Sequence, residues 1–117
     1  MENIGINQLV RSNEVAWKPL VEEGVNTAGL WVKGLRYEKN GVRTSTFLLK
    51  FEAGASYPLH NHPAGEEAYV LEGEVRFGKI HLFTGDYLYT APNERHSVYS
   101  KTGCVILFLV PQEVEIL

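Results

Sequence analysis

The sequence predicts an all-β domain, either a sandwich or a jelly-roll barrel, and three observations support this fold class. Short apolar or alternating runs recur along the chain, and each is followed by a turn signal. After residue 25, helical periodicity nowhere persists beyond about two turns. β-branched and aromatic residues, which favour strands, are plentiful. About eight short strands in about 90 residues are typical of a sandwich or a jelly roll.

The positions of the strands follow from these runs and from the glycine-containing pairs between them. Strands are expected at Leu30–Glu38, Val42–Phe51, Glu66–Leu71, Glu74–Phe77, Lys79–Phe83, Tyr87–Thr90, Ser97–Ser100 and Val105–Val110. Turns are expected at Asn40-Gly41, Ala53-Gly54, Glu72-Gly73, Thr84-Gly85 and Thr102-Gly103. Trp17–Leu20 is expected to form an extended edge segment, because Pro19 cannot donate a hydrogen bond to a β-ladder. We therefore divide the chain into an N-terminal extended segment, 1–25, and one β-barrel domain, 26–117.

Length and charge exclude several classes of protein. The 117 residues lie near the commonest size of one domain, and no repeat or polar linker indicates a second one. The net charge is -3, and no cluster of Lys and Arg could neutralise phosphates in series, so nucleic acid is not an expected partner. The first residues lack a signal-peptide pattern, and the longest apolar run, Cys104–Val110, is too short to span a bilayer. We expect a cytoplasmic protein without a membrane partner, in which Cys104 is a buried, inert thiol.

The segment 54–73 holds side chains that suit a divalent metal ion. His60 and His62 are two residues apart, so on an extended backbone both imidazoles project from one face. A turn follows, and Glu66 then supplies an anionic oxygen. Thirty residues later, a second turn brings His96 to the start of another strand. We predict that these four residues bind one divalent ion, which is iron, zinc or manganese.

The spacing of these residues resembles the first motif of the cupin superfamily. That motif has a glycine, five residues, His-any-His, three or four residues, a glutamate, six residues and a glycine. It is matched at every spacing by Gly54, His60, His62, Glu66 and Gly73. The resemblance implies a jelly-roll barrel with a metal in its mouth.

The second cupin motif is matched more loosely. Its glycine, turn proline and histidine are matched by Gly85, Pro92 and His96. Six residues rather than five separate the first two of these. The segment 93–95 lacks the turn glycine, and Ser100 stands where many members have asparagine. These departures affect the shape of the turn more than the chemistry of the ligands, since His96 remains.

Within the superfamily, one branch is the most similar. Gly65-Glu66-Glu67 leading to Val70–Gly73, with the short turn from Pro92 to His96, resembles the cupin domains of zinc-binding anti-sigma factors and small iron-dependent dioxygenases that cleave diketones. The similarity extends from about Trp17 to Val110. It implies a single cupin domain, often a homodimer, that takes a small-molecule ligand or substrate.

Only one of the neighbours Glu66 and Glu67 can point into the barrel, because adjacent strand residues face opposite sides. The strand's alternation does not decide between them, since both faces are largely apolar. The six residues between Glu66 and Gly73 match the cupin spacing, and Ala68 leaves room beside a metal where Tyr69 would crowd it. We therefore expect Glu66 to be the ligand.

Several other residues have a simpler structural interpretation. His81 lies outside both motifs and is expected to be structural or solvent-facing. Arg76 and Arg95 are expected at the surface, although an inward orientation would let them bind an acidic substrate. The tyrosines of the strands are expected to pack, and none is singled out as a pocket hydroxyl: Tyr57, Tyr69, Tyr87, Tyr89 and Tyr99.

Three hypotheses about function remain. The first is a metal-dependent oxygenase acting on a small ketone-like molecule, in which iron(II) keeps open positions for O₂ and substrate. The second is a metal-loaded module that binds a small molecule or senses redox state without catalysis, for which zinc is suited. The third is a dimer-forming barrel that a metal only stabilises. No metal-binding helical domain precedes the barrel here, so direct anti-sigma action is not expected, and no catalytic residue is assigned.

Overall fold

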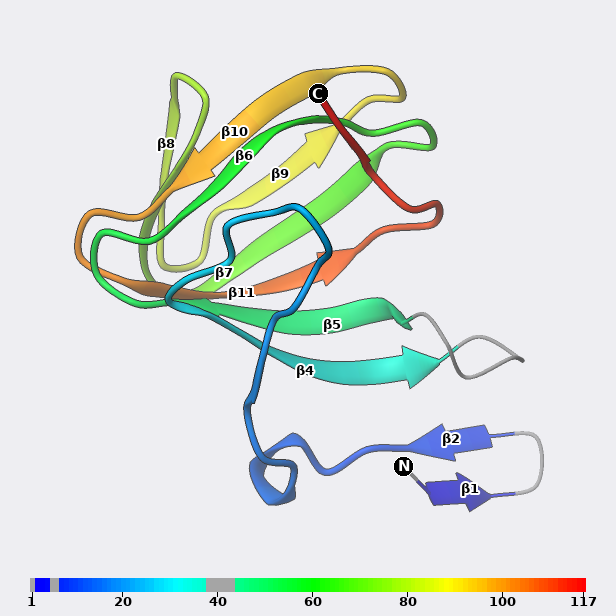
Figure 1. Ribbon diagram of the computed structural model, residues 1–117. Helices are drawn as coiled ribbons and strands as arrows, with labels where there is room; N and C mark the ends of the chain where they lie inside the picture. Colours follow the sequence, from blue (N-terminus) through cyan, green and yellow to red (C-terminus); the bar gives the residue numbers. More distant parts are fainter. Residues whose placement is uncertain (1, 5–6, 38–43) are drawn as a thin grey trace.

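A computed structural model describes residues 2–4, 7–37 and 44–117, and strands dominate it (Figure 1). The elements in chain order are β1 Glu2–Ile4, β2 Asn7–Leu9, η1 Ser12–Glu14, β3 Lys18–Pro19, β4 Leu30–Tyr37, β5 Thr44–Phe51, β6 Ser56–Asn61, β7 Glu66–Phe77, β8 Ile80–Phe83, β9 Tyr87–Thr90, β10 Arg95–Tyr99, β11 Cys104–Leu109 and β12 Glu115–Ile116. The short 3-10 turn η1 is the only helical element among the described residues. The all-β fold class is therefore confirmed.

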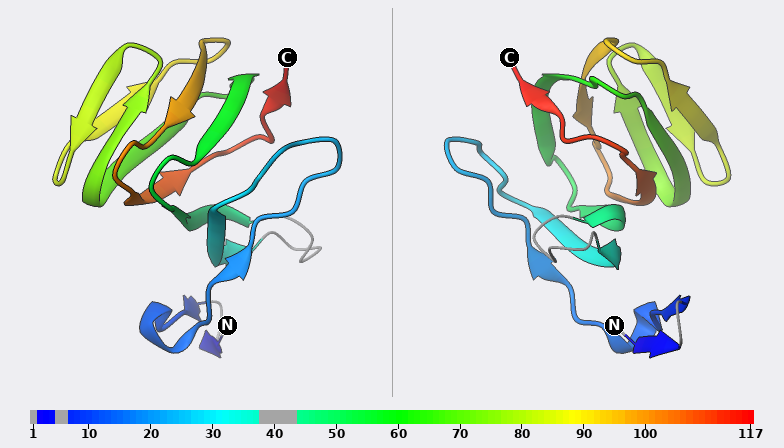
Figure 2. Two further views of the ribbon diagram at one scale, coloured as in Figure 1. Left: turned by 60° about the vertical axis from the view of Figure 1, so that its left-hand side comes forward. Right: turned by 90° about the vertical axis from the view of Figure 1, so that its right-hand side faces the viewer.

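The strands from β3 onward form one curled sheet, and its two halves face each other as layers (Figure 2). Its order is β12-β6-β10-β7-β11-β5-β4-β3, and β8 and β9 also pair with β7. The first part of β7 pairs with β9 and β11, and its last residues pair with β8 and β10. Strand β7 therefore belongs to both layers and connects them.

The hydrophobic core fills the space between the layers. On β7, the inward residues Ala68, Val70, Val75 and Phe77 are at most 2% exposed, whereas Tyr69 between them is 42% exposed. This alternation is the period of a strand with one face on a core. Removing a large apolar side chain from water contributes roughly 1.5–3 kcal/mol to stability. Packing of these inward faces therefore holds the two layers together.

The turn expected at Glu72-Gly73 does not form, and this prediction was wrong. The expected strands Glu66–Leu71 and Glu74–Phe77 are one strand, β7, and Gly73 stays paired with Cys104. The register shifts beside this pair, so one extra residue of β7 is accommodated as a bulge. Gly73 has φ 87°, which glycine adopts at little cost. The strand therefore bends from one layer into the other without leaving the ladder.

Strand β6 (Ser56–Asn61) was not among the predicted strands, although an extended backbone was expected around His60. It pairs with β10 and β12. Its hydrophobic alternation is weak, because Pro58 interrupts the run and buried polar side chains occupy inward positions. The register shift between His96 and Val98 of β10 lies opposite Pro58, where a residue without an N–H is tolerated.

The other expected strands are present with small changes at their ends. Tyr87–Thr90 is reproduced, and β8, β10 and β11 begin or end within two residues of their expected positions. Strand β4 ends at Tyr37 and β5 begins at Thr44; the expected ends at Glu38 and Val42, with the Asn40-Gly41 turn, lie outside the described residues. The edge position expected for Trp17–Leu20 is confirmed, because in the described part of the chain β3 ends the sheet and pairs only with β4.

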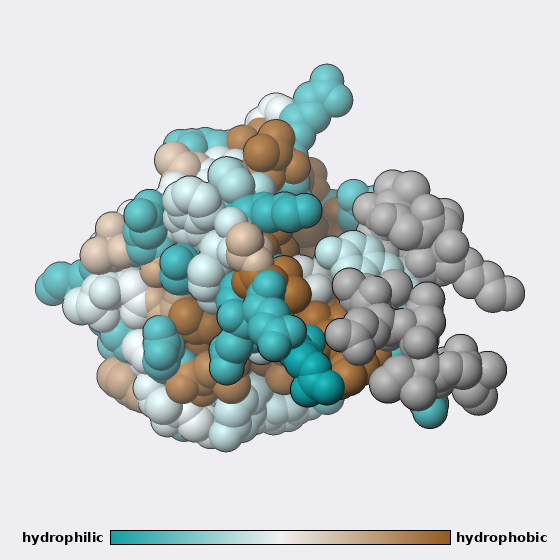
Figure 3. Space-filling model, turned by 90° about the horizontal axis from the view of Figure 1, so that it is seen from below, coloured by the Kyte–Doolittle hydropathy of each residue, from teal (hydrophilic) through white to brown (hydrophobic). Residues whose placement is uncertain are grey.

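The surface is mixed in polarity. On the face seen from below in Figure 3, apolar side chains show between polar ones rather than as one continuous apolar area. In the described part of the chain, no helix is long and apolar enough to cross a membrane.

Glu74 on β7 joins three segments of the chain. Its carboxylate accepts hydrogen bonds from Ser100 (3.1 Å), from the Thr102 N–H (3.1 Å) and hydroxyl (2.9 Å), and contacts His81 Nε2 at 2.9 Å. Burial alone would raise the pKa of Glu74, but the Thr102, His81 and Ser100 contacts outweigh it and lower that pKa to about 2. The Ser100 side chain is fully buried and also donates to the Glu74 carbonyl at 2.6 Å. Ser100 therefore has a structural role at this position.

Glu74→Gln is expected to lower the free energy of unfolding at pH 7 by about 1–2 kcal/mol, because hydrogen bonds to a charged acceptor are weakened. A carboxyl group with a lowered pKa stabilises the fold above its unfolded pKa, and this contribution is lost as pH falls. The difference from wild type should therefore be constant above about pH 5.5 and shrink between about pH 4.5 and 2. Urea unfolding across this range measures it, with exposed Glu72→Gln as the control. A pH-independent difference would contradict the assigned network.

Candidate metal centre

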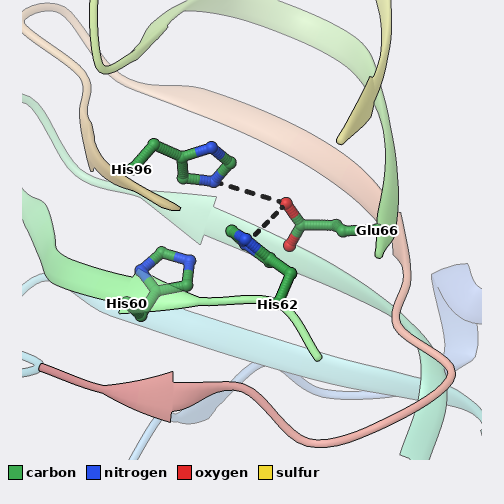
Figure 4. Close-up of side chains that lie close together, drawn as sticks. All are labelled: His60, His62, Glu66 and His96. Carbon is green, nitrogen blue, oxygen red and sulfur yellow. Dashed lines mark ion pairs between the residues drawn. The ribbon is translucent and has the colours of Figure 1, made fainter. Parts of the chain in front are cut away.

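Four side chains from three strands and one turn meet inside the barrel (Figure 4). His60 lies near the end of β6, His62 follows that strand, Glu66 opens β7 and His96 is on β10. His60 and His96 are partners in the β6–β10 ladder, so their side chains are brought together by strand pairing. One ligand atom from each of the four residues lies within 4.8 Å of the others. The sequence-predicted set is therefore assembled at one place.

The hydrogen bonds of two imidazoles orient them as metal ligands. His60 Nδ1 lies 2.7 Å from the Pro58 carbonyl oxygen, and His62 Nδ1 lies 2.8 Å from that of Glu94. A carbonyl oxygen only accepts, so each Nδ1 carries the proton and each Nε2 keeps its lone pair. Such backbone partners are the usual way in which a metal-binding imidazole is fixed.

Three buried polar atoms of the cluster lack hydrogen-bond partners: His62 Nε2, His96 Nε2 and Glu66 Oε2. Glu66 Oε2 is 3.2 Å from His62 Nε2 and 3.4 Å from His96 Nε2, but neither contact has the geometry of a hydrogen bond. The side chains are 6%, 0% and 9% exposed, so water does not replace these bonds. Ligand atoms about 2.0–2.2 Å from one ion lie roughly 3.0–3.5 Å from each other. These buried atoms are therefore spaced as they would be around a divalent ion.

The charges of the cluster also fit a cation. Burial alone would raise the pKa of Glu66, but contacts with His62 and His96 outweigh it and lower that pKa, so the carboxylate is ionised. Burial lowers the pKa of His60 to about 4, so this imidazole is neutral. For His62, burial is outweighed by the Glu66 carboxylate and the Glu94 carbonyl, which raise its pKa. A divalent ion would supply the positive charge that the buried carboxylate attracts.

Glu66 faces the cluster and Glu67 does not, as expected from the strand register. Glu66 is 6% exposed, whereas the half-buried Glu67 accepts a hydrogen bond from the Tyr87 hydroxyl at 2.6 Å. Ala68, on the same face as Glu66, is 1% exposed, and Tyr69 is on the outer face.

Four of the residues given a structural interpretation are not members of the cluster: His81, Arg76, Arg95 and Cys104. His81 contacts Glu74 and is 30% exposed, and Arg76 and Arg95 are exposed. Cys104 is a buried free thiol, and burial raises its pKa to about 11, so it remains protonated. The interpretations of these four residues are confirmed. The expectation that the strand tyrosines pack was wrong for four of the five, which are 41–57% exposed: Tyr69, Tyr87, Tyr89 and Tyr99.

An apolar cavity of about 170 Å³ lies directly beside the cluster, with His60 and Glu66 in its wall. Its lining is mostly apolar and aromatic, and its other members are Leu20, Glu22, Phe47, Leu49, Phe51, Tyr57, Val98, Phe108, Val110, Glu113 and Val114. Tyr57 is 8% exposed, and its hydroxyl donates to Glu22 at 2.5 Å. Sequence reasoning missed Glu22, because it lies in an irregular segment that no motif marks; Tyr57 was one of five undistinguished tyrosines.

Metal removal tests whether the cluster binds an ion. Stripping metal with a chelator is expected to lower the melting temperature by about 10 °C, because an ion at about 100 times its dissociation constant adds roughly 2.7 kcal/mol. Adding divalent metal back should restore it. His96→Gln should abolish the response, whereas His81→Gln, outside the cluster, should keep it. An unchanged melting temperature in the wild type, with no metal found before chelation, would contradict metal binding.

Solved structures of other proteins share this fold. A candidate acetylacetone dioxygenase from Methylibium petroleiphilum PM1 has a TM-score of 0.80 at 18% identity, covering 100% of this chain and 85% of that chain. An acetylacetone dioxygenase from Acinetobacter johnsonii has a TM-score of 0.76 at 13% identity, covering 100% and 80%. At these identities the likeness shows the fold alone.

A third structure is the complex of Rhodobacter sphaeroides SigE with the anti-sigma ChrR. It has a TM-score of 0.65 at 22% identity, with 86% of this chain and 50% of that chain covered. This chain thus spans about half the length of the chain that it matches there. A comparison with curated proteins found no match.

A family model decides the classification. The model described as the ChrR Cupin-like domain matches residues 7–113, nearly the whole chain. The match agrees with the two cupin motifs, with the curled jelly-roll sheet and with the solved structures above. The chain belongs to the ChrR Cupin-like domain family.

Proposed function

We propose that this protein is a metal-dependent oxygenase that acts on a small ketone-like molecule, with one divalent ion held by His60, His62, Glu66 and His96. One observation supports it above the others: the buried cluster, with its unpartnered ligand atoms, forms part of the wall of an apolar cavity. A ligand in that cavity would lie next to the proposed ion. The solved acetylacetone dioxygenases of the same fold support the substrate class.

The residues of this chain would bind and orient the reactants. Bound iron(II) would supply electrons for O₂ and polarise the oxygen atoms of a substrate. The three imidazoles and the carboxylate would hold the ion, and a six-coordinate ion held by four protein ligands would have positions left for O₂ and substrate. His60 and Glu66 are in the cavity wall, and the rest of the lining is mostly apolar and aromatic, which suits an apolar part of a substrate. At about 170 Å³ the cavity is smaller than the roughly 300–1,000 Å³ of drug-sized pockets, which favours a small substrate.

A second candidate is a metal-loaded module that binds a small ligand, or senses redox state, without catalysis. Membership of a family named after an anti-sigma factor supports it. Zinc has no redox chemistry and would suit such a module, whereas an oxygenase would need iron. The same cavity would then hold a ligand that is bound and released unchanged.

Two measurements separate these functions. Element analysis of protein purified from its native host identifies the metal, and an oxygen electrode records uptake with 2,4-pentanedione. Iron with substrate-dependent uptake, lost in His96→Gln and kept in Glu67→Gln, supports the oxygenase. Zinc without uptake, in protein that still binds the diketone, supports the module and contradicts the oxygenase.

A further inference from the structure

The cavity beside the cluster has an unusual balance of charges. Among the residues that the structure describes, its lining includes three carboxylates, Glu22, Glu66 and Glu113, and no lysine or arginine. Glu22 is half-buried and Glu113 is exposed, whereas Glu66 belongs to the buried cluster. With one divalent ion present, the three carboxylates would still leave one negative charge in excess. Glu22 and Glu113, which are not members of the cluster, therefore make the lining of the cavity acidic.

Two observations support the assignment of this acidic lining to a ligand site. Glu66 Oε2 is buried, lacks a hydrogen-bond partner and belongs to a residue of the cavity wall. Tyr57, also in the wall, ties Glu22 in place through its hydroxyl. Burial raises the pKa of Tyr57, with further increases from the Glu22 hydrogen bond and from the charges of Glu22, Glu113 and Glu66. The phenol therefore stays protonated and keeps donating to Glu22.

We propose that Glu22 and Glu113 determine the substrate class of this cavity, which admits small uncharged oxygen chelators and rejects molecules of the same size that carry a free carboxylate. The inference rests on the proposed function for its substrate type. A carboxylate entering the cavity would be repelled by the like charges of Glu22, which is half-buried, and of Glu113, which is exposed and more strongly screened by water. Such repulsion gives selectivity without any contact that improves binding of the preferred ligand.

A pair of ligands of nearly equal size tests this selectivity. 2,4-Pentanedione is uncharged, and acetoacetate replaces one of its acetyl groups with a carboxylate. Titration calorimetry on the zinc-loaded protein measures binding of each without turnover. We expect 2,4-pentanedione to bind at least tenfold more tightly than acetoacetate. The ratio of the two dissociation constants should shrink in about 1 M salt, because salt screens charges near the surface.

Variants assign the selectivity to the two glutamates. The double variant Glu22→Gln with Glu113→Gln should reduce the ratio of dissociation constants at least fivefold, because acetoacetate binds it more tightly. The amide oxygen introduced by Glu22→Gln can still accept the hydrogen bond from Tyr57. Glu72→Gln removes the same charge from an exposed position outside the cavity and should leave the ratio unchanged. Equal binding of the two ligands by the wild type, or a ratio unaffected by the double substitution, would overturn this inference alone. Binding of neither ligand would overturn it together with the proposed cavity function, while oxygen uptake by iron-loaded protein separately decides the oxygenase.

Discussion

Gly73→Ala is expected to lower the free energy of unfolding by at least about 3 kcal/mol, the range of substitutions that combine strain with a clash. Gly73 has φ 87°, a conformation that alanine resists. An added Cβ would also overlap the Gly103 carbonyl oxygen and lie 2.8 Å from Cys104 Cα. Both obstacles are backbone atoms of the paired strand region, so they cannot rotate away. The bend that lets β7 serve both layers would be lost or distorted.

Gly54→Ala is the matched control for this experiment. Gly54 has a similar φ of 84°, but a Cβ there would meet nothing within 4 Å. Its substitution should cost only the conformational strain, about 1 kcal/mol. Urea unfolding of both variants measures the difference. Equal losses of unfolding free energy in the two variants would show that steric overlap does not contribute to the effect of Gly73→Ala.

Glu66→Gln is expected to weaken metal binding at least tenfold, about 1.4 kcal/mol, whereas Glu67→Gln should change it less than twofold. The substitution at 66 removes the one negative charge that is buried among His60, His62 and His96. The substitution at 67 removes an equal charge from the neighbouring residue, whose carboxylate accepts a hydrogen bond from Tyr87 instead.

Titration of the two variants with the native metal gives the affinities, and the melting temperature of each apo-protein checks its folding. A damaging Glu67→Gln with a neutral Glu66→Gln would mean that the ligand is misassigned and the register of β7 differs by one. Similar small effects in both would mean that the carboxylate does not bind the ion.

Local sequence patterns predicted most strands, because inward and outward residues alternate along each of them. The Tyr87–Thr90 strand is an example. The inward direction of Glu66 was predicted instead from the cupin spacing and from the small side chain of Ala68, because both faces of that strand are largely apolar. Where the pattern failed, a long-range partner decided the structure. Strand β6 forms around Pro58 because β10 and β12 supply its hydrogen bonds, and β7 continues through Gly73 because Cys104 remains its partner.

The sequence by itself determined the β fold class and the candidate ligands His60, His62, Glu66 and His96. Those conclusions depend on residue types and on their spacing within short segments, and both can be read directly from the sequence. Only the tertiary structure decided which residues share the cavity, because its wall is assembled from the segments around Glu22, Tyr57 and Glu113 as well as from the ligands. These segments lie far apart in the sequence and carry no common pattern. Their proximity results from the curling of the sheet, which no local spacing encodes.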